Sequence, residues 1–337
     1  MTRPQVLIVL ALASVLTCAA APFVGAPPIA VGIVFEQEDA DAGHANPDRF
    51  ILRQIRIPRV ALAFLAGASL ALCGMAFQSM FRNPLATPFT LGVSSGASLG
   101  ALIALRLGLT TALLGISTVT IGAFLGALIA ISLVYGLTRM RGGFSTSTML
   151  LAGVAVSFFF SSLILFIQYT ADIYDSFRLM RWLMGGIATA PGYTAVTNAL
   201  PFAIPGALVV FYCAHELNLL ATGDEIAISR GVNVKKTKVL LFFATSVTVG
   251  GVVAQCGPIG FIGMMAPHIC RLLIGPDHRY LAPATCLFGG AFLATCDTFA
   301  RTVLAPAELP VGVVTAFLGG PFFLWLLMRG EADRNLH

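Results

Sequence analysis

The sequence predicts an all-α protein that crosses a membrane many times, and three observations support this. Of the 337 residues, 57% are hydrophobic and only 10% are charged, whereas soluble domains carry about 25% charged residues. Long intervals contain no Asp, Glu, Lys or Arg, and most reach the ~20 residues that a helix needs to cross a bilayer. No interval shows the alternation of apolar and polar residues that is typical of a membrane β-barrel.

The uncharged intervals locate the membrane helices along the chain. They are residues 4–35, 60–81, 83–105, 107–138, 142–171, 182–214, 239–267, 280–296 and 309–328. We expect about ten spans rather than nine, because Gly257-Pro258-Ile-Gly260 interrupts the seventh interval. A proline flanked by glycines ends one helix and lets another begin. The two resulting helices are predicted at 239–256 and at about 260–274.

Residues 5–25 are predicted to form the first span. Arg3, an apolar run and Thr-Cys-Ala-Ala-Ala are also typical of a signal peptide, and Cys18 suggests a lipidation site. Thr17 is a poor residue before a lipidated cysteine, so we expect an uncleaved helix. The seven cysteines include no CxxC pair and are expected to be buried small apolar residues.

The distribution of Lys and Arg predicts that both termini lie in the cytoplasm. With ten spans, the inner side receives the three lysines together with Arg3, Arg82, Arg139, Arg141, Arg230, Arg271, Arg279, Arg329 and Arg334. The outer side receives the acidic loop 36–41 together with Asp172 and Asp175.

One cytoplasmic stretch, Gly223 to Lys238, holds all three lysines as well as Asp224, Glu225 and Arg230. Apolar residues between these charges predict short amphipathic helices lying across the membrane face. The two acidic residues favour a helix start, and Gly231 favours a helix end. The stretch is either a solvated loop that follows the positive-inside rule or a docking surface for a cytosolic partner.

If a multi-span protein of this kind moves a solute across the membrane, its energy source also bears on this choice. An ion-coupled secondary transporter normally carries ionisable residues within its spans, and the nine uncharged intervals have no Asp, Glu, Lys or Arg. The sequence has no GxxxxGK[ST] loop with which to bind ATP itself. Energy must then come from a partner through a surface, with a stand-alone ion-coupled transporter as the alternative. A membrane-embedded enzyme is disfavoured, because no span holds His, Asp, Glu and Cys at ligand spacing, and His268 lacks a second metal ligand.

Three groups of motifs resemble the FecCD family, the permease subunits of binding-protein-dependent ABC importers for iron-siderophores, haem and cobalamin. The first group is Arg56-Ile-Pro-Arg59 with Arg82-Asn-Pro-Leu-Ala86 and the 91–97 segment. The second is Gly260-Phe-Ile-Gly263 followed by Pro267-His268, and the third is Glu308-Leu-Pro-Val-Gly312 followed by the 318–323 segment. The resemblance covers about residues 50–328.

The resemblance implies a single permease domain over residues 1–337, with ten helices and an inverted repeat relating helices 2–5 to helices 7–10. It implies a homodimer in the bacterial inner membrane, two cytosolic ATPase subunits that hold ATP and Mg²⁺, and a periplasmic substrate-binding protein. The chain itself is expected to be non-catalytic and to bind no cofactor or metal. An iron chelate, as a siderophore or haem, is the favoured cargo, with cobalamin as the further possibility.

The resemblance also implies roles for individual residues. The coupling helices for the ATPase span about 216–238 and include Gly223, Asp224, Glu225, Ala227, Arg230 and Gly231. Arg56, Arg59 and Arg301 are implied to dock the binding protein. The alternative is that they anchor helix ends at the membrane–water interface. Thr146 and Ser147 are gate candidates, although hydroxyls at a helix start usually cap it. The pathway is expected to be lined by Leu150, Gly153, Val154 and Ser157.

Overall fold

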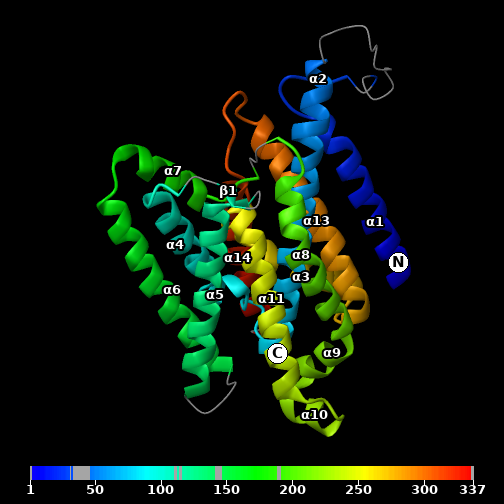
Figure 1. Ribbon diagram of the computed structural model, residues 1–337. Helices are drawn as coiled ribbons and strands as arrows, with labels where there is room; N and C mark the ends of the chain where they lie inside the picture. The colour runs from blue at the N-terminus through cyan, green and yellow to red at the C-terminus, as the bar shows by residue number, and fades with distance from the viewer. Residues whose placement is uncertain are drawn as a thin grey trace.

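The computed structural model describes residues 2–30, 32, 46–109, 112–113, 116–140, 146–187 and 191–334, and these form a bundle of helices (Figure 1). The acidic loop 36–41 lies outside the described residues. The helices are α1 Arg3–Ala20, α2 Pro47–Phe50, α3 Ile57–Phe81, α4 Val93–Arg106, α5 Thr118–Met140, α6 Thr146–Tyr169, α7 Ile173–Leu183, α8 Thr194–Tyr212, α9 Ala214–Thr222, α10 Asp224–Ser229, α11 Val234–Cys256, α12 Ile262–Ile274, α13 His278–Thr302 and α14 Val311–Arg334.

Short elements connect these helices. A 3₁₀ turn, η1 Ala21–Phe23, follows α1, and a π-helical turn, η3 Ile51–Arg56, joins α2 to α3. A second 3₁₀ turn, η4 Pro88–Leu91, precedes α4. Strands β1 Ala112–Leu113 and β2 Ile116–Ser117 pair antiparallel before α5. The all-α prediction is confirmed, since these two-residue strands are the only sheet within the described residues.

The helices differ in their suitability for crossing a membrane. Within the described residues, six helical segments are long and apolar enough by length and composition, and these contain α1, α3, α5, α6, α8 and α11. Helices α4, α12 and the Val311–Leu326 part of α14 are shorter and apolar. Helix α13 has the length but carries Asp297 and Arg301. The multi-span character is therefore clear, while ten spans and an inverted repeat stay predictions.

Local sequence signals set several helix boundaries. The predicted break after residue 256 is present: α11 ends at Gly257 with φ +66°, and α12 begins after Phe261 with φ +68°. Arg82 adopts a left-handed conformation and ends α3, so the Arg82–Ala86 motif follows α3. Asn233 caps α11 by accepting a hydrogen bond from the Lys236 backbone N–H at 3.1 Å. Each signal lies in the residues beside the boundary that it sets.

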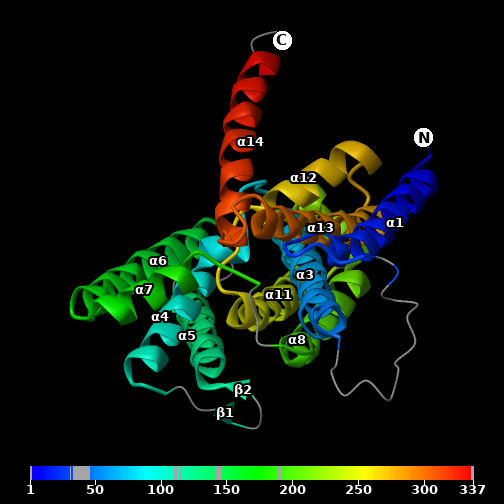
Figure 2. The ribbon, with the colours of Figure 1, turned by 90° about the horizontal axis from the view of Figure 1, so that it is seen from above.

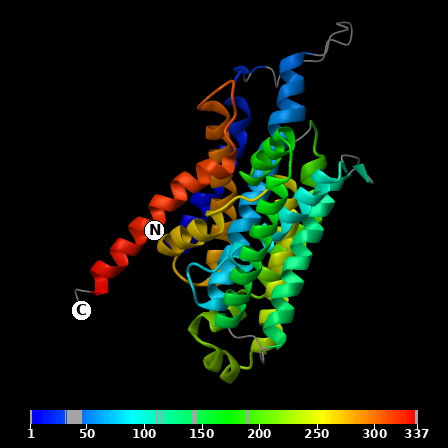
Figure 3. The ribbon, with the colours of Figure 1, turned by 90° about the vertical axis from the view of Figure 1, so that its left-hand side faces the viewer.

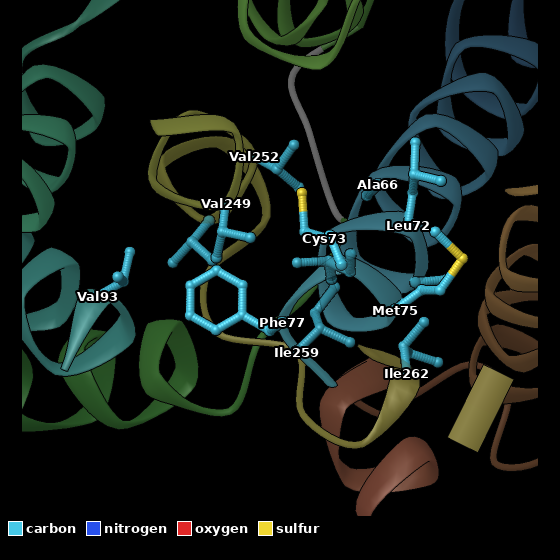
Figure 4. Packing of buried hydrophobic residues seen from close by; sticks show 14 of the residues in the cluster. Ala66, Leu72, Cys73, Met75, Phe77, Val93, Val249, Val252, Ile259 and Ile262 are labelled. Atoms are coloured by element: carbon cyan, nitrogen blue, oxygen red, sulfur yellow. The ribbon is translucent and has the colours of Figure 1, made fainter. Parts of the chain in front are cut away.

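Helix α3 forms the centre of the bundle. In its most apolar 18-residue window, 83% of the residues are buried, against 22% for α6. Figure 4 shows Leu72, Cys73 and Phe77 of α3 within the buried cluster, with Val249 of α11 nearby. Because α3 is enclosed on nearly all sides, its position depends on every helix packed around it.

Small residues allow the closest helix contacts. Helix α3 lies along α13, and α4 lies along α5. A Cβ atom on Gly67 of α3 would lie 2.2 Å from the Gly289 carbonyl oxygen of α13, and one on Gly100 of α4 would lie 2.0 Å from the Gly122 carbonyl oxygen of α5. Membrane helices associate through such close backbone approach, because lipid provides no hydrophobic drive between them.

Helices α6 and α14 are more loosely attached. Figures 2 and 3 show α14 leaving the bundle at an angle, so that its end stands clear of the other helices. Val311 at its start is only 1% exposed, whereas Phe317 is 78% exposed. On α6, Phe158 is 71% exposed. Both helices therefore present apolar side chains away from the rest of the chain.

We expect Gly100→Ala to destabilise the protein by about 1–3 kcal/mol, because the new methyl group overlaps the α5 backbone. Gly136→Ala is the matched control on α5, since a Cβ atom there meets nothing within 4 Å, and alanine favours a helix over glycine by about 1 kcal/mol. Free energies of unfolding measured in detergent by denaturant titration test the pair. Equal stability of the two variants would contradict the close α4–α5 contact.

Candidate functional site

The three arginines predicted to dock a binding protein lie close together, near the α2 end of the bundle. Arg56 ends η3, Arg59 lies in the first turn of α3, and Arg301 lies in the last turn of α13. All three are largely buried, with exposures of 4%, 8% and 7%. Guanidinium groups buried to this extent need hydrogen-bond acceptors within the protein. The residues that supply these acceptors belong to the same candidate site.

Arg56 and Arg301 both hold the segment that follows α1. Arg56 donates from Nη1 to the Pro22 carbonyl oxygen at 3.2 Å and from Nη2 to the Pro27 carbonyl oxygen at 2.5 Å. Arg301 donates to the Ala21 carbonyl oxygen and, at 3.3 Å, to Thr298 Oγ1. The bonds to Ala21, Pro22 and Pro27 hold the segment after α1 against the start of α3 and the end of α13 by way of backbone carbonyls.

Arg59 makes the strongest interactions of the three arginines. Its Nε and Nη2 donate to the two carboxylate oxygens of Asp297 at 2.9 and 3.0 Å, a bidentate pair between α3 and α13. Its Nη1 donates to Glu308 Oε2 at 2.8 Å, in the segment between α13 and α14. The Asp297 side chain is 1% exposed and the Glu308 side chain 41%. Arg59 thus has one buried acidic partner and one at the surface.

Asp297 and Glu308 were not predicted to be site residues. Asp297 follows directly on an uncharged interval and lies four residues before Arg301. A lone acidic residue in an otherwise apolar helix could therefore have identified it as a candidate site residue. Such residues are usually paired and functional. Three guanidinium groups and two carboxylates form this cluster, and the carboxylate of Asp48 acts on Arg56 from nearby.

The gate and pathway candidates lie on α6, and they do not share one face. Helix α6 begins at Thr146, and Ser145 before it lies outside the described residues. Ser147 and Val154 are exposed, Gly153 is buried, and Leu150 is half-buried against the core. Gly153 packs so closely that a Cβ atom would lie 2.6 Å from Leu91 Cα. Gly153 therefore allows α6 to pack closely against the segment that contains Leu91, while Ser147 and Val154 face outward.

Ser157 borders a groove between α4 and α6. Its hydroxyl donates to the Gly153 carbonyl oxygen at 2.8 Å. The groove has a volume of about 500 Å³ and is lined by Phe89, Ser94, Ser95, Ser98, Ser157, Ser161, Ile164, Leu165, Gln168 and Leu183. Its lining combines hydroxyls and one amide with apolar side chains and includes no charged residue. Such a surface can contact a large solute without binding it tightly.

The stretch that gathers the lysines contains the short helix α10 and the start of α11, and it follows α9 at the opposite end of the bundle from α2 (Figure 1). Gly223, with φ +136°, separates α9 from α10. Gly231, with φ +84°, follows α10, where its N–H donates to the Ile228 carbonyl oxygen at 2.9 Å and the next N–H donates to that of Ala227 at 3.0 Å. This pair of bonds is a Schellman cap. The predicted stop at Gly231 is confirmed, and one short helix, α10, lies within the stretch, while its placement across the membrane face stays a prediction.

The charges of this stretch divide into an internal pair and an exposed set. Lys238 Nζ lies 2.6 Å from Asp224 Oδ2, with side-chain exposures of 4% and 38%, so this pair ties α10 to α11. Glu225 and Arg230 are exposed. Ile226 and Ile228 on the same short helix are 48% and 62% exposed. A surface that mixes exposed isoleucines with both signs of charge is suited to binding another protein.

Comparison with known proteins places these features in a family. The model of the FecCD transport family matches residues 7–329. The chain is 40% identical over 283 residues to the hemin transport system permease protein HmuU of Yersinia pestis, which covers 83% of this chain and 84% of that protein. It is 42% identical over 285 residues to the cobalamin import system permease protein BtuC of Halobacterium salinarum, which covers 83% of this chain and 74% of that protein.

Solved structures give the same result for the fold. The chain matches a metal-chelate type ABC transporter in an inward-facing conformation with a TM-score of 0.85 and 29% identity, over 97% of this chain and 99% of that one. PsaBC from Streptococcus pneumoniae in complex with Fab matches with a TM-score of 0.52 and 13% identity, over 82% of this chain and 92% of that one. This second match is a likeness of fold alone.

The two acidic partners of Arg59 should differ in their contribution to stability. We expect Asp297→Ala to cost about 3–5 kcal/mol, because it removes the bidentate partner of a buried guanidinium group. Glu308→Ala should cost at most ~1 kcal/mol, as for other partly exposed ion pairs. Unfolding in detergent measures both, and equal losses would show that burial does not set the strength of these pairs.

Proposed function

The chain belongs to the FecCD transport family, and from this we infer that it is the membrane permease of an ABC importer. The observation that carries the inference is the family match over residues 7–329, together with 40% identity to a hemin permease over most of both chains. The chain forms the translocation unit, while a separate subunit binds ATP and Mg²⁺ and hydrolyses the ATP. No cofactor or metal is assigned to the chain itself.

An iron chelate, either haem or a ferric siderophore, is the proposed cargo, with cobalamin as the further candidate. Support comes from relatives named for hemin and for cobalamin transport and from the metal-chelate type transporter that shares the fold. The uncharged groove between α4 and α6 suits a conduit, because a charged or tightly fitting site would hold the cargo and slow its release.

The proposed orientation places α10 in the cytoplasm and the arginine cluster in the periplasm, in the bacterial inner membrane, with both chain ends cytoplasmic. Exposed Lys235 and Lys236 near α10 support it, because cytoplasmic segments are enriched in basic residues. Single-domain organisation over residues 1–337, ten spans and the inverted repeat belong to the same proposal.

A second copy of the chain is the proposed neighbour of α6 and α14. Support comes from their exposed apolar side chains, such as Phe158 and Phe317, and from the angle at which α14 leaves the bundle (Figure 3). In a homodimer the α6 helices flank a central pathway, with Thr146 and Ser147 near its cytoplasmic end as gate candidates. Disulfide formation between two copies of a Ser147→Cys variant that lacks the native cysteines tests this placement.

Uptake into proteoliposomes tests the proposed function. Vesicles contain the chain and its ATPase, with haemin, a ferric hydroxamate siderophore or cobalamin supplied on the cognate binding protein. We expect uptake of at least one of these compounds to require ATP and to stop with vanadate. Uptake driven by an ion gradient without the ATPase would support the ion-coupled alternative. That alternative would have to use Asp297, which is instead held by Arg59.

The coupling proposal for residues 216–238 gives a test confined to exposed charges. We expect Glu225→Lys combined with Arg230→Glu to weaken ATPase binding while leaving membrane insertion intact, since both side chains are exposed. Asp224 is left unchanged, because its reversal would leave buried Lys238 unpaired. Arg139→Glu, an exposed change at the end of α5, is the control. Co-purification measures binding, and full retention of the ATPase would contradict docking at α10.

Docking at Arg56, Arg59 and Arg301 remains a proposal, and it now requires an exchange of partners. A carboxylate of the binding protein can reach Arg59 Nη1 only by replacing Glu308, which is the exposed partner. Reversing Arg59 to Glu would place two carboxylates together at Asp297, so loss of function in that variant would say little about docking.

Glu308→Gln should therefore strengthen docking of the binding protein by up to about fivefold, the equivalent of ~1 kcal/mol for a partly exposed pair. Asp172→Asn is the control, because it removes an equal charge from an exposed position where the side chain caps α7, a role that asparagine can keep. The concentration of binding protein that half-maximally stimulates ATP hydrolysis reports the change. The same gain in both variants would indicate a general charge effect, and no gain in Glu308→Gln would remove Arg59 from the docking surface.

A further inference from the structure

A hydrogen-bonded network next to the coupling helices has no role in the sites described above. Asn218 of α9 donates from Nδ2 to Asp277 Oδ1 at 2.9 Å. Its Oδ1 accepts hydrogen bonds from the His278 backbone N–H at 2.8 Å and from His278 Nδ1 at 2.7 Å. The Asn218 amide helps to hold the pKa of the Asp277 carboxyl below its usual range. One amide side chain thus binds the N-terminus of α13.

The network continues into α3 through the imidazole of His278. His278 Nε2 lies 2.5 Å from Ser79 Oγ, and these residues are only 2% and 5% exposed. Because Asn218 Oδ1 can only accept, His278 Nδ1 carries the proton, and in the neutral ring Nε2 accepts from the Ser79 hydroxyl. The Ser79 oxygen also lies 3.0 Å from the Met75 carbonyl oxygen of the same helix, and its single proton goes to His278, since the neutral Nε2 has no proton of its own to donate. Side chains from α9, α13 and α3 are therefore joined in one continuous chain.

Helix α10 has two main supports. It packs on α9 and on α11, and the Asp224–Lys238 pair fastens it to α11. Helix α9 in turn packs on α3 and α13, with Leu217 and Leu220 fully buried. Apolar contacts of this kind allow one helix to slide on another, whereas a satisfied polar contact fixes the register. The Asn218 network fixes α9 to α3 and α13.

Helices α3 and α13 carry this connection to the far end of the molecule. Ser79 and Arg59 lie near opposite ends of α3, and His278 and Asp297 lie on α13. The two helices are thus joined by Ser79–His278 at one end and by Arg59–Asp297 at the other. Between these contacts, the two backbones approach so closely at Gly67 that no side chain fits between them.

We propose that Asn218, His278 and Ser79 are positioning residues that transmit movement of α10 to the paired helices α3 and α13, and through them to the arginine cluster. The proposal rests on the proposed function, in which a partner ATPase moves α10. It assigns these buried residues to the coupling of hydrolysis to transport, with no contact to ATP or cargo.

The test uses the full complex in proteoliposomes and measures the amount of haemin, siderophore or cobalamin, whichever the unaltered complex transports, that is taken up per ATP hydrolysed. We expect Asn218→Leu and Ser79→Ala each to lower this ratio about tenfold, within the 5–150-fold range of typical coupling between sites. ATPase binding and basal hydrolysis should persist. Ser79→Thr, which keeps the hydroxyl, should restore much of the ratio.

Thr138→Val is the matched control, because it removes a buried hydroxyl whose hydrogen bond to the Val134 carbonyl oxygen stays within α5. This variant should leave the ratio unchanged. If Asn218→Leu and Ser79→Ala lower uptake and hydrolysis in proportion, or leave the ratio unaltered, the network is only structural and the proposal is overturned. If the unaltered chain fails to bind an ATPase at all, the proposed function fails instead, so the two failures are distinguishable.

Discussion

The contact between α3 and α13 is the constraint on which the rest of the structure depends. At Gly67 and Gly289 the two backbones approach so closely that no side chain fits between them. Arg59 and Asp297 then join the helices near one end and Ser79 and His278 near the other. The geometry of the α3–α13 pair is therefore fixed at three points. Because α3 is also the most enclosed of the six apolar segments, the other helices pack around this pair.

Burying a guanidinium group and a carboxylate is costly, so the Arg59–Asp297 pair needs a reason beyond stability. An apolar pair of similar volume would hold two membrane helices together at least as well. The charged pair differs in that it leaves one donor, Arg59 Nη1, for a carboxylate at the surface. Because Asp297 fixes the orientation of the Arg59 guanidinium group, Arg59 Nη1 is a preorganised donor that points toward the surface. This arrangement suits replacement of Glu308 by an acidic group of a partner as the acceptor.

The sequence predicted those features that depend on neighbouring residues. Composition and uncharged intervals indicated the helical membrane fold, Gly257-Pro258 indicated the break between α11 and α12, and Gly231 indicated the stop after α10. Each follows from backbone preferences or from hydrophobicity within one segment. Contacts between distant segments were not predicted. Asp297 meets Arg59 across 238 positions of the chain, and Asn218 meets His278 across 60. No local pattern encodes such pairings, and the ion pair of Asp224 with Lys238 was likewise not predicted.

The distribution of polar groups explains how a chain with so few charges can respond at both ends. Helix α6 and the groove beside it carry hydroxyls and apolar side chains, which can pass a bulky solute without tight binding. The charged and strongly hydrogen-bonded groups instead occupy the ends of α3 and α13. In the proposed importer these ends face different partners, the binding protein outside and the ATPase inside. A stiff helix pair between them can transmit a signal without any charge near the middle of the membrane, where an unpaired ion would be most costly.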